Sequence, residues 1–506
     1  MFAKINSLGL FGLNAFNVDV EIEISRGIPA FDIVGLPDLV VKESRERIKA
    51  SMRCCNIEFP VAKVMVNLAP AGTRKSGSVH DIAILVAVLK AAGYIKENLD
   101  SCCFIGELSL NGTLRPIEGV LPMVLLARET GFKSVFVPKD NAFEASVAEG
   151  IDIYAAESVS QILDHFTMRT RIEKQPKFIP ENKPENYTFD FSDVKGQKTA
   201  KAALEIAAAG GHNALLIGTP GSGKSMLAKR MPSILPEMTF EESIETTKIH
   251  SISGLLDPKS PLVTERPFRT PHHTISAAGL AGGGSIPKPG EISLAHNGLL
   301  FLDELAEFDR KTLEILRQPL EDGKVTISRA AGTVVYPASI MLIAAMNPCP
   351  CGYYPDMNKC RCTPGEVSHY LHKLSQPLLE RIDLCADVPP VNFSQISGEK
   401  SGESSALIRK RVEKARRIQQ KRYQNEKICF NGELSGKQIR KYCVLTENAI
   451  QVAKNAFELM ELSARSYHRI LKVSRTIADM EGEELIHTRH VAEALTYKAF
   501  DKKYRS

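Results

Sequence analysis

The segment that most constrains the fold is the glycine-rich run GTPGSGKS at residues 218–225. It follows the apolar run NALLI, typical of a buried strand, and precedes the helix-forming run MLAKRM. The backbone N–H groups of such a loop surround nucleotide phosphates, its lysine reaches the β- and γ-phosphates, and its last hydroxyl binds Mg²⁺. The pattern therefore predicts a site for ATP and Mg²⁺. Its predicted residues are Gly218, Thr219, Pro220, Gly221, Ser222, Gly223, Lys224 and Ser225.

Two further apolar runs, GLLFL and IMLIAAM, end in polar side chains. Because the carboxyl ends of parallel strands meet at one edge of a sheet, we expect these side chains to converge on the same phosphates. Asp303 is predicted to ligate Mg²⁺ together with Ser225. Glu304 is predicted to polarise the attacking water, and Asn347 to orient it.

The length of 506 residues predicts about two to four domains. Residues 1–167 alternate β-like runs with apolar helical stretches, as in an α/β domain. Residues 168–190 are charged and rich in proline, which favours a linker. Residues 191–395 show the pattern of a parallel sheet covered by helices, and residues 396–506 are mainly helical. The predicted fold class is α/β.

Several features bear on location and partners. The N-terminus lacks the pattern of a secretory leader, and no apolar run approaches membrane-spanning length. We therefore expect a cytoplasmic protein with no membrane partner. Residues 401–506 hold 22 Lys and Arg against 13 Asp and Glu. This basic balance favours approach to nucleic acid, although a solvated helical surface is its commoner cause.

Four of the eleven cysteines form a C-x-C…C-x-C pattern directly after Asn347. Four thiolates suit a closed tetrahedral zinc site. The alternative is a set of reduced thiols in a cytosolic loop. The predicted ligands are Cys349, Cys351, Cys360 and Cys362.

Three longer segments carry a family resemblance: FRTPHHTISAAGLAGGGSIPKPGEISLAHNGLLFLDE, AAMNPCPCGYY and LLERIDL. Together they resemble the ComM/YifB family of magnesium-chelatase-like AAA+ ATPases, over nearly the whole chain. The resemblance implies a homohexamer in which Arg381 enters the neighbouring subunit's site as an arginine finger. An intramolecular ion pair is the alternative for Arg381. Arg465 is implied to reach ATP from a helical lid, with Arg475 as the second choice.

In this clade a hairpin before the strand that ends at the asparagine projects into a central pore. Residues 324–329 and 333–336 fit such a hairpin, which makes Arg329 the candidate DNA contact, although an ordinary surface hairpin predicts the same pattern. The glycine-rich run AGLAGGGSIPKPGE is implied to face the same pore. His272 and His273 lack a suitably spaced carboxylate, so we expect a structural or loop role for them.

The first third resembles the proteolytic domain of Lon, through NLAPAGTRKSGSVHDIAILVAVLKAAG and GELSLNGTLRPIEGVLPMVLLARETGFKSVFVP. The nucleophile position of that domain is occupied by Val79, and the segment 118–123 lacks the general-base lysine. Ser78 lies one residue away. A peptide-bond nucleophile needs a base to activate it, so the sequence predicts a degenerate, noncatalytic domain with no protease substrate.

The resemblance as a whole implies an AAA+ core with a C-terminal helical lid, acting as a DNA helicase. Its implied substrates are single-stranded and branched DNA, with branch migration during DNA integration in natural transformation or recombination. The alternative is a protein-remodelling or metal-chelatase-type AAA+ ATPase.

Overall fold

The computed structural model describes the chain except residues 180–186, 285–286, 331, 391–401, 427 and 499–506. The chain divides into two compact units. The first comprises Met1–Lys183, Phe240–Thr264 and Ala330–Val335, and the second comprises Pro184–Thr239, Glu265–Arg329 and Tyr336–Ser506. Part of the predicted linker, the predicted boundary at 395/396 and Ala331 of the predicted hairpin lie outside the described residues.

The first unit is built on a seven-stranded sheet with the order β3-β4-β2-β1-β5-β8-β9. Strand β2 pairs antiparallel with β1 and β4, and the remaining neighbours are parallel. The strands are β1 (Phe2–Phe11), β2 (Asn14–Ser25), β3 (Ala30–Val34), β4 (Lys63–Ala69), β5 (Cys102–Phe104), β8 (Ser134–Pro138) and β9 (Asp152–Ala156), beside a small pair, β6 (Glu107–Leu108) and β7 (Leu114–Arg115).

Helix α2 (Asp81–Ala91) forms the centre of this unit. It is apolar on every side, and residues 82–89 have no exposed surface, as expected for a helix that is hydrophobic all round. The other helices of the unit are α1 (Leu39–Cys54), α3 (Val120–Glu129), α4 (Ala142–Ala145), α5 (Val159–Phe166) and α8 (Phe240–Ile252).

Helix α8 belongs to this first unit although it lies within the predicted segment 191–395. Its Ser251 Oγ donates a hydrogen bond to Glu144 Oε1 at 2.5 Å. Glu144 also accepts from the backbone N–H of Leu121, at the start of α3. The local sequence of this helix does not show which core it packs against.

The second unit contains a five-stranded sheet with the order β11-β14-β17-β10-β18, in which all neighbours are parallel. The α/β fold with a parallel sheet, predicted from the sequence, is confirmed. Strand β10, which leads into the glycine-rich loop, lies between β17 and β18. The strands are β10 (Ala214–Gly218), β11 (Phe268–Arg269), β14 (Leu299–Leu302), β17 (Met341–Met346) and β18 (Leu384–Val388).

Shorter elements connect these strands. Among the helices are α6 (Lys198–Gly210), α7 (Lys224–Ala228), α9 (Ala277–Ala281), α10 (Glu291–Leu294), α11 (Arg310–Glu314), α12 (Arg317–Asp322), α13 (Pro364–Leu371) and α14 (Gln376–Leu379). An antiparallel pair is formed by β12 (Gly282–Gly283) and β13 (Lys288–Pro289), and a further two-stranded sheet consists of β15 (Lys324–Arg329) and β16 (Gly332–Pro337).

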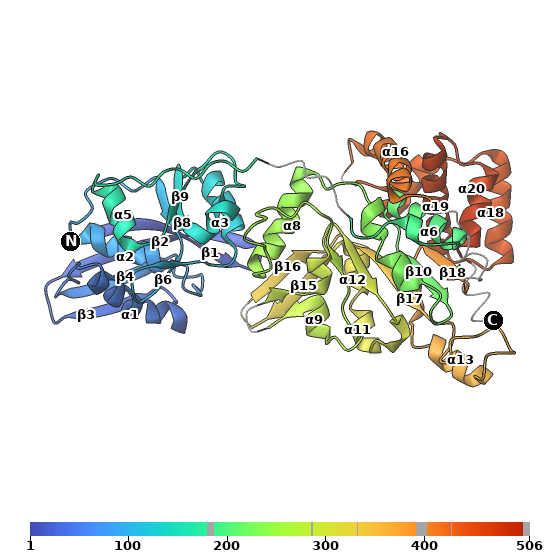
Figure 1. The fold of residues 1–506 in the computed structure, drawn as a ribbon, viewed down its shortest axis with the longest axis horizontal. Coiled ribbons are helices and arrows are strands. Elements are labelled where there is room, and N and C mark those ends of the chain that lie inside the picture. The colour runs from blue at the N-terminus through green and yellow to red at the C-terminus, as the bar shows by residue number, and fades with distance from the viewer. Residues whose placement is uncertain (180–186, 285–286, 331, 391–401, 427, 499–506) are drawn as a thin grey trace. The chain divides into compact units, whose positions relative to one another are not determined.

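The C-terminal part is helical, as predicted. Figure 1 shows its helices gathered in one group beside α6, and α16 and α19 pack against α6. The helices are α16 (Ser405–Tyr423), α17 (Gly436–Tyr442), α18 (Glu447–Leu459), α19 (Ala464–Glu481) and α20 (Thr488–Thr496). In the part of the chain that the structure describes, no helix has the length and apolarity needed to cross a membrane.

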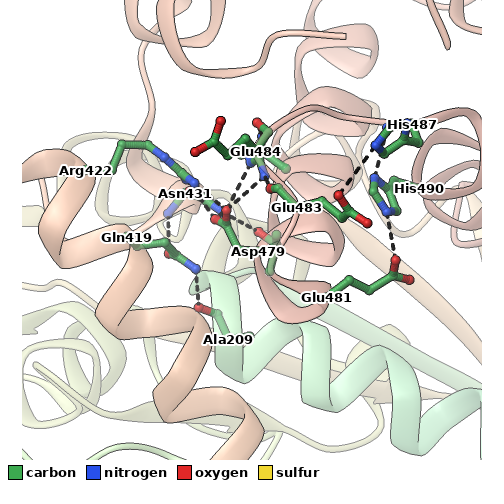
Figure 2. A network of polar contacts seen from close by, with 12 residues as sticks. Ala209, Gln419, Arg422, Asn431, Asp479, Glu481, Glu483, Glu484, His487 and His490 are labelled. Atoms are coloured by element: carbon green, nitrogen blue, oxygen red, sulfur yellow. Dashed lines mark hydrogen bonds and ion pairs between the residues drawn. The ribbon is translucent and has the colours of Figure 1, made fainter. Parts of the chain in front are cut away.

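A polar network ties the C-terminal helices to α6 (Figure 2). Gln419 Nε2 donates to the carbonyl oxygen of Ala209 at 3.0 Å, and Gln419 Oε1 accepts from the backbone N–H of Asn431 at 3.0 Å. Asn431 Nδ2 donates to Asp479 Oδ2 at 2.9 Å, and Arg422 pairs with the same carboxylate. Buried polar groups that all find partners fix one arrangement of the helices.

Candidate nucleotide-binding site

The glycine-rich loop begins where β10 ends and runs into α7. Gly221 has a φ of 73° and Gly223 a φ of 96°, in the left-handed region that favours glycine. A side chain at either position would be strained, so the loop needs these glycines to make its turn. The order strand, loop and helix that the sequence predicts is present.

Lys224 lies inside the loop that precedes it. Its Nζ donates to the carbonyl oxygens of Gly218 and Thr219, at 2.8 and 2.9 Å, and to Asn347 Oδ1 at 3.2 Å. Burial lowers the pKa of Lys224, while the charges of Asp303 and Glu304 act to raise it. The predicted phosphate-binding lysine and the predicted asparagine are thus in direct contact, although 123 positions separate them in the sequence.

The two predicted Mg²⁺ ligands also meet. Ser225 Oγ donates to Asp303 Oδ2 at 2.5 Å. A hydroxyl and a carboxylate oxygen are the hard donors that Mg²⁺ prefers, with nucleotide phosphates and water completing the shell. The donor set therefore fits Mg²⁺.

Glu304 follows Asp303 at the end of β14 and has a φ of 51°. Left-handed backbone at a residue other than glycine is uncommon, and strained backbone of this kind clusters at functional sites. Glu304 Oε2 lies 3.5 Å from His273 Nδ1. The local sequence around His273 offers no carboxylate partner. Glu304, which follows β14, supplies one. The contact places His273 beside the predicted catalytic carboxylate, and its structural or loop role stays a prediction.

Arg381 lies at the opposite edge of the sheet from the glycine-rich loop. Its carbonyl oxygen accepts from Asn213 Nδ2 at 2.9 Å, just before β10 begins, whereas the loop starts at the other end of β10. The five residues of β10 span about 13 Å at the usual strand rise. The backbone of Arg381 is therefore separated from its own phosphate loop by the length of this strand.

The guanidinium of Arg381 forms an ion pair with the Glu321 carboxylate, and its side chain is only 8% exposed. Arg465 Nη2 lies 2.6 Å from the other oxygen of Glu321. The intramolecular pair that the sequence left as an alternative for Arg381 is therefore present. The finger role of Arg381 and the ATP contact of Arg465 stay predictions. Glu321, which joins the two arginines, carries no sequence signal of its own.

The turn that carries Arg381 is anchored to α19 through Asp383. Arg469 Nε lies 3.5 Å from Asp383 Oδ1, and His212 Nδ1 lies 3.3 Å from Asp383 Oδ2. Burial alone would raise the pKa of Asp383, but the hydrogen bond from His212 and the charges of His212, Arg469 and Lys472 lower it to about 2. Asp383 is therefore ionised at neutral pH.

Arg475, the second choice for the lid arginine, has a packing role. It is 1% exposed, and its Nη1 donates to the carbonyl oxygen of Glu484 at 2.6 Å. Its Nε donates to Asp479 Oδ1 at 3.1 Å. The guanidinium of Arg475 is thus occupied by contacts at the C-terminal end of α19. The Arg465 side chain, by contrast, is 42% exposed.

Arg329, the predicted DNA contact, is exposed at the end of β15. A Cβ built on Gly283 would lie 3.4 Å from Arg329 Nη2. The predicted hairpin and the glycine-rich run around β12 and β13 therefore lie side by side. On the other strand of the hairpin, Gly332 lies against the Phe11 ring, within the first unit.

The four predicted zinc ligands gather at one point. One ligand atom from each of Cys349, Cys351, Cys360 and Cys362 lies within 4.8 Å of all the others. Sulfur is the donor that tetrahedral structural zinc sites most often use. The chemistry and closeness of these donors fit zinc.

The Lon-like segment has local partners in the first unit. The Ser78 hydroxyl donates to the Glu107 carboxylate, and the Lys75 ammonium donates to the Pro70 carbonyl. His80 is buried, which lowers its pKa to about 3, with a smaller contribution from the Lys75 charge. The noncatalytic role of this domain stays a prediction.

The parallel sheet, the loop that holds Lys224, the Ser225–Asp303 pair and the helical C-terminal part together define a P-loop protein of the AAA+ class. Family models described as "Magnesium chelatase, subunit ChlI", "Subunit ChlI of Mg-chelatase" and "Magnesium chelatase, subunit ChlI C-terminal" match residues 190–396, 20–141 and 402–498, respectively. The chain belongs to the ComM/YifB family of magnesium-chelatase-like AAA+ proteins.

Relatives of nearly equal length support this assignment. The chain is 41% identical over 505 residues to competence protein ComM of Haemophilus influenzae, covering 98% of this chain and 97% of the relative. It is 40% identical over 504 residues to the uncharacterized protein YifB of Salmonella typhimurium, covering 99% and 97%. A shorter match, 24% identical over 197 residues and covering 35% of each chain, is to Lon protease 2 of Bacillus subtilis.

Proposed function

We propose that this protein is an ATP-hydrolysing DNA motor that works as a homohexamer and promotes branch migration during DNA integration in natural transformation or recombination. The observation that carries the ATPase part is the meeting of Lys224 with Asn347, and of Ser225 with Asp303, at the carboxyl ends of three parallel strands. Ligands of parallel-sheet proteins bind at that edge.

The residues divide the work of hydrolysis. Lys224 binds the β- and γ-phosphates, and Ser225 and Asp303 hold Mg²⁺, which neutralises charge on the phosphate oxygens when bound. Glu304 polarises the attacking water, and Asn347 orients it beside the γ-phosphate. His273 positions Glu304 through their 3.5 Å contact. Arg381 supplies positive charge to the site of the neighbouring subunit.

Three observations support DNA as the partner. Arg329 is exposed next to the glycine-rich run around β12, so a cationic side chain lies beside a segment of low steric bulk. The last 106 residues carry an excess of positive charge. The Haemophilus influenzae relative is named a competence protein.

The experiment that tests the class is an ATPase assay of the wild-type protein with three added partners: a four-way DNA junction, single-stranded DNA and an unfolded protein. Stimulation by the junction and by single-stranded DNA, together with branch migration of the junction, is the expected result. Absence of junction binding would overturn the DNA proposal.

A second candidate function is protein remodelling or metal-chelatase-type action. It is favoured by the three magnesium-chelatase family models, which together match most of the chain. Stimulation of ATP hydrolysis by unfolded protein alone, with no response to either DNA, would select this candidate.

Arg329→Ala is expected to weaken the DNA-stimulated ATPase and branch migration while leaving basal hydrolysis and assembly unchanged. It removes one phosphate contact outside the nucleotide site, so the slope of log affinity against log salt should fall by about 1. Junction affinity over a salt series measures this slope. Lys324→Ala, at the other end of the same strand, is the matched control. An unchanged slope for Arg329→Ala would remove Arg329 from the DNA interface.

Purified protein is expected to contain about one zinc ion per chain, held by the four clustered thiolates. Serine substitution of the pair Cys349 and Cys351 should release the metal, because a serine hydroxyl is a poor zinc ligand. Elemental analysis of protein purified without chelators measures the zinc content. The control is Cys54→Ser, at an exposed position on α1 outside the cluster. Zinc-free protein in which all four thiols react with an alkylating reagent would contradict the proposed metal site.

A further inference from the structure

The four-cysteine cluster holds its sulfurs close enough together to share one metal ion. The Cys349 sulfur lies 3.4 Å from that of Cys351 and 3.8 Å from that of Cys360, and the last two sulfurs are 3.6 Å apart. Four sulfurs at the usual zinc–sulfur distance from one ion are separated by about 3.8 Å. The backbone N–H groups of Gly352 and Tyr354 point at the Cys349 sulfur, at 3.2 and 3.4 Å. Such outer hydrogen bonds stabilise a ligand in its charged form.

The same loop packs directly on the phosphate-binding loop. Gly352 has a φ of 85°, and a Cβ built on it would lie 2.4 Å from Pro220 Cδ and 2.7 Å from Pro220 Cγ. No side chain fits between the two backbones at this point. Gly352 therefore links a ligand sulfur, to which it donates, with Pro220 of the phosphate-binding loop.

A second connection runs through the chain itself. Cys349 follows Asn347 by two positions, and Asn347 Oδ1 accepts from Lys224 Nζ at 3.2 Å. The cluster is thus attached to the nucleotide site at two points, the Pro220 ring and the Asn347 amide. Pro220 belongs to the predicted phosphate-binding loop, and Asn347 is the residue predicted to orient the attacking water.

We propose that metal occupancy of the four-cysteine cluster controls the affinity of the phosphate-binding loop for ATP. This inference rests on the proposed ATPase function and on the proposed zinc site. Zinc fixes the positions of its ligands, and therefore of Gly352 and Asn347, because coordination energy becomes available to order the loop that carries the ligands. Loss of the metal frees this loop and removes the support of Pro220. The nucleotide site is then less well preorganised.

The coupling has a thermodynamic consequence that can be measured from both sides. If zinc tightens ATP binding by a given factor, ATP must tighten zinc binding by the same factor. Couplings of this kind amount to about 5- to 150-fold. Two independent titrations therefore have to agree, and neither involves ATP hydrolysis.

The test uses the full chain carrying Glu304→Gln, so that ATP is not consumed. Zinc content is measured by elemental analysis, and ATP affinity by calorimetry, for protein as purified, after chelation, and after zinc is restored. The expected result is an ATP affinity that falls by at least about fivefold on chelation and recovers with zinc. Zinc affinity, measured by competition with a chelator, should rise by the same factor in saturating ATP.

Gly352→Ala tests the contact itself. The added methyl group is expected to displace Pro220 and weaken ATP binding while zinc stays bound. Gly131→Ala is the matched control, because Gly131 has a similar φ of 88° and has no neighbour within 4 Å of a built Cβ. A second variant, Pro220→Ala, removes the ring from the loop side. It is expected to shrink the ratio of ATP affinities with and without zinc.

The possible outcomes distinguish a failure of the proposed coupling from a failure of the zinc site or of the proposed ATPase function. Bound zinc whose removal leaves ATP affinity unchanged overturns the coupling but leaves the zinc site and the ATPase standing. Protein that takes up no zinc after reconstitution removes the metal site and the coupling with it. Failure of the unmodified protein to bind ATP overturns the proposed function itself.

Discussion

Replacing Glu304 by glutamine is expected to leave ATP binding intact and to lower the steady-state rate of hydrolysis by on the order of 10²- to 10⁴-fold. Glutamine keeps the shape of the side chain but removes the carboxylate that we propose polarises the attacking water. The left-handed backbone at Glu304 and its contact with His273 hold that carboxylate in place, and an amide inherits the same position. The rate is measured in an ATPase assay, and binding by calorimetry.

Two further variants locate the effect. Glu307→Gln changes a carboxylate three positions away, which lies 3.6 Å from Lys373, and hydrolysis should stay near the wild-type rate. Lys224→Ala should instead lose ATP binding, because the proposed role of this lysine is to contact the phosphates in the ground state as well as in the transition state. A Glu304→Gln protein that hydrolyses ATP as fast as wild type would remove Glu304 from the mechanism.

The chemistry at the strand ends was predictable because it follows from one rule of sheet geometry. Apolar runs that end in Asp303 and in Asn347 identify buried strands, and parallel strands bring their carboxyl ends to one edge. The structure accordingly places Ser225 against Asp303, and Lys224 against Asn347. The need for glycine at positions 221 and 223 was also predictable from the local sequence, because the turn of the loop requires positive φ there.

The features that could not be predicted are contacts between segments that are distant in the sequence and share no motif. His273 gains its carboxylate from Glu304, on another strand, and Glu321 pairs with two arginines from different elements. The packing of Gly352 on Pro220 is also a tertiary contact. Nothing in the local sequence of α8 assigns this helix to the first unit.

The remaining large effect concerns Arg381, whose backbone lies at the far edge of the sheet from its own phosphate loop. Arg381→Ala is expected to bind ATP and DNA but to hydrolyse ATP about 10³-fold more slowly, because an arginine supplied across a subunit interface stabilises charge in phosphoryl transfer. The matched control is Arg317→Ala, on the neighbouring helix α12, where the ion pair with Glu314 is local. ATPase rates at concentrations where the proposed hexamer forms measure the difference.

Mixing subunits tests whether the arginine acts on its neighbour. Arg381→Ala subunits keep Glu304, and Glu304→Gln subunits keep Arg381, so about a quarter of the interfaces in an equal random mixture unite both groups. Turnover should therefore reappear in the mixture although each variant alone is inactive. Arg465→Ala, mixed in the same way, is expected to behave alike, because Arg465 shares Glu321 with Arg381. A mixture with no recovered turnover would place the arginine in its own subunit's site or in a purely structural ion pair.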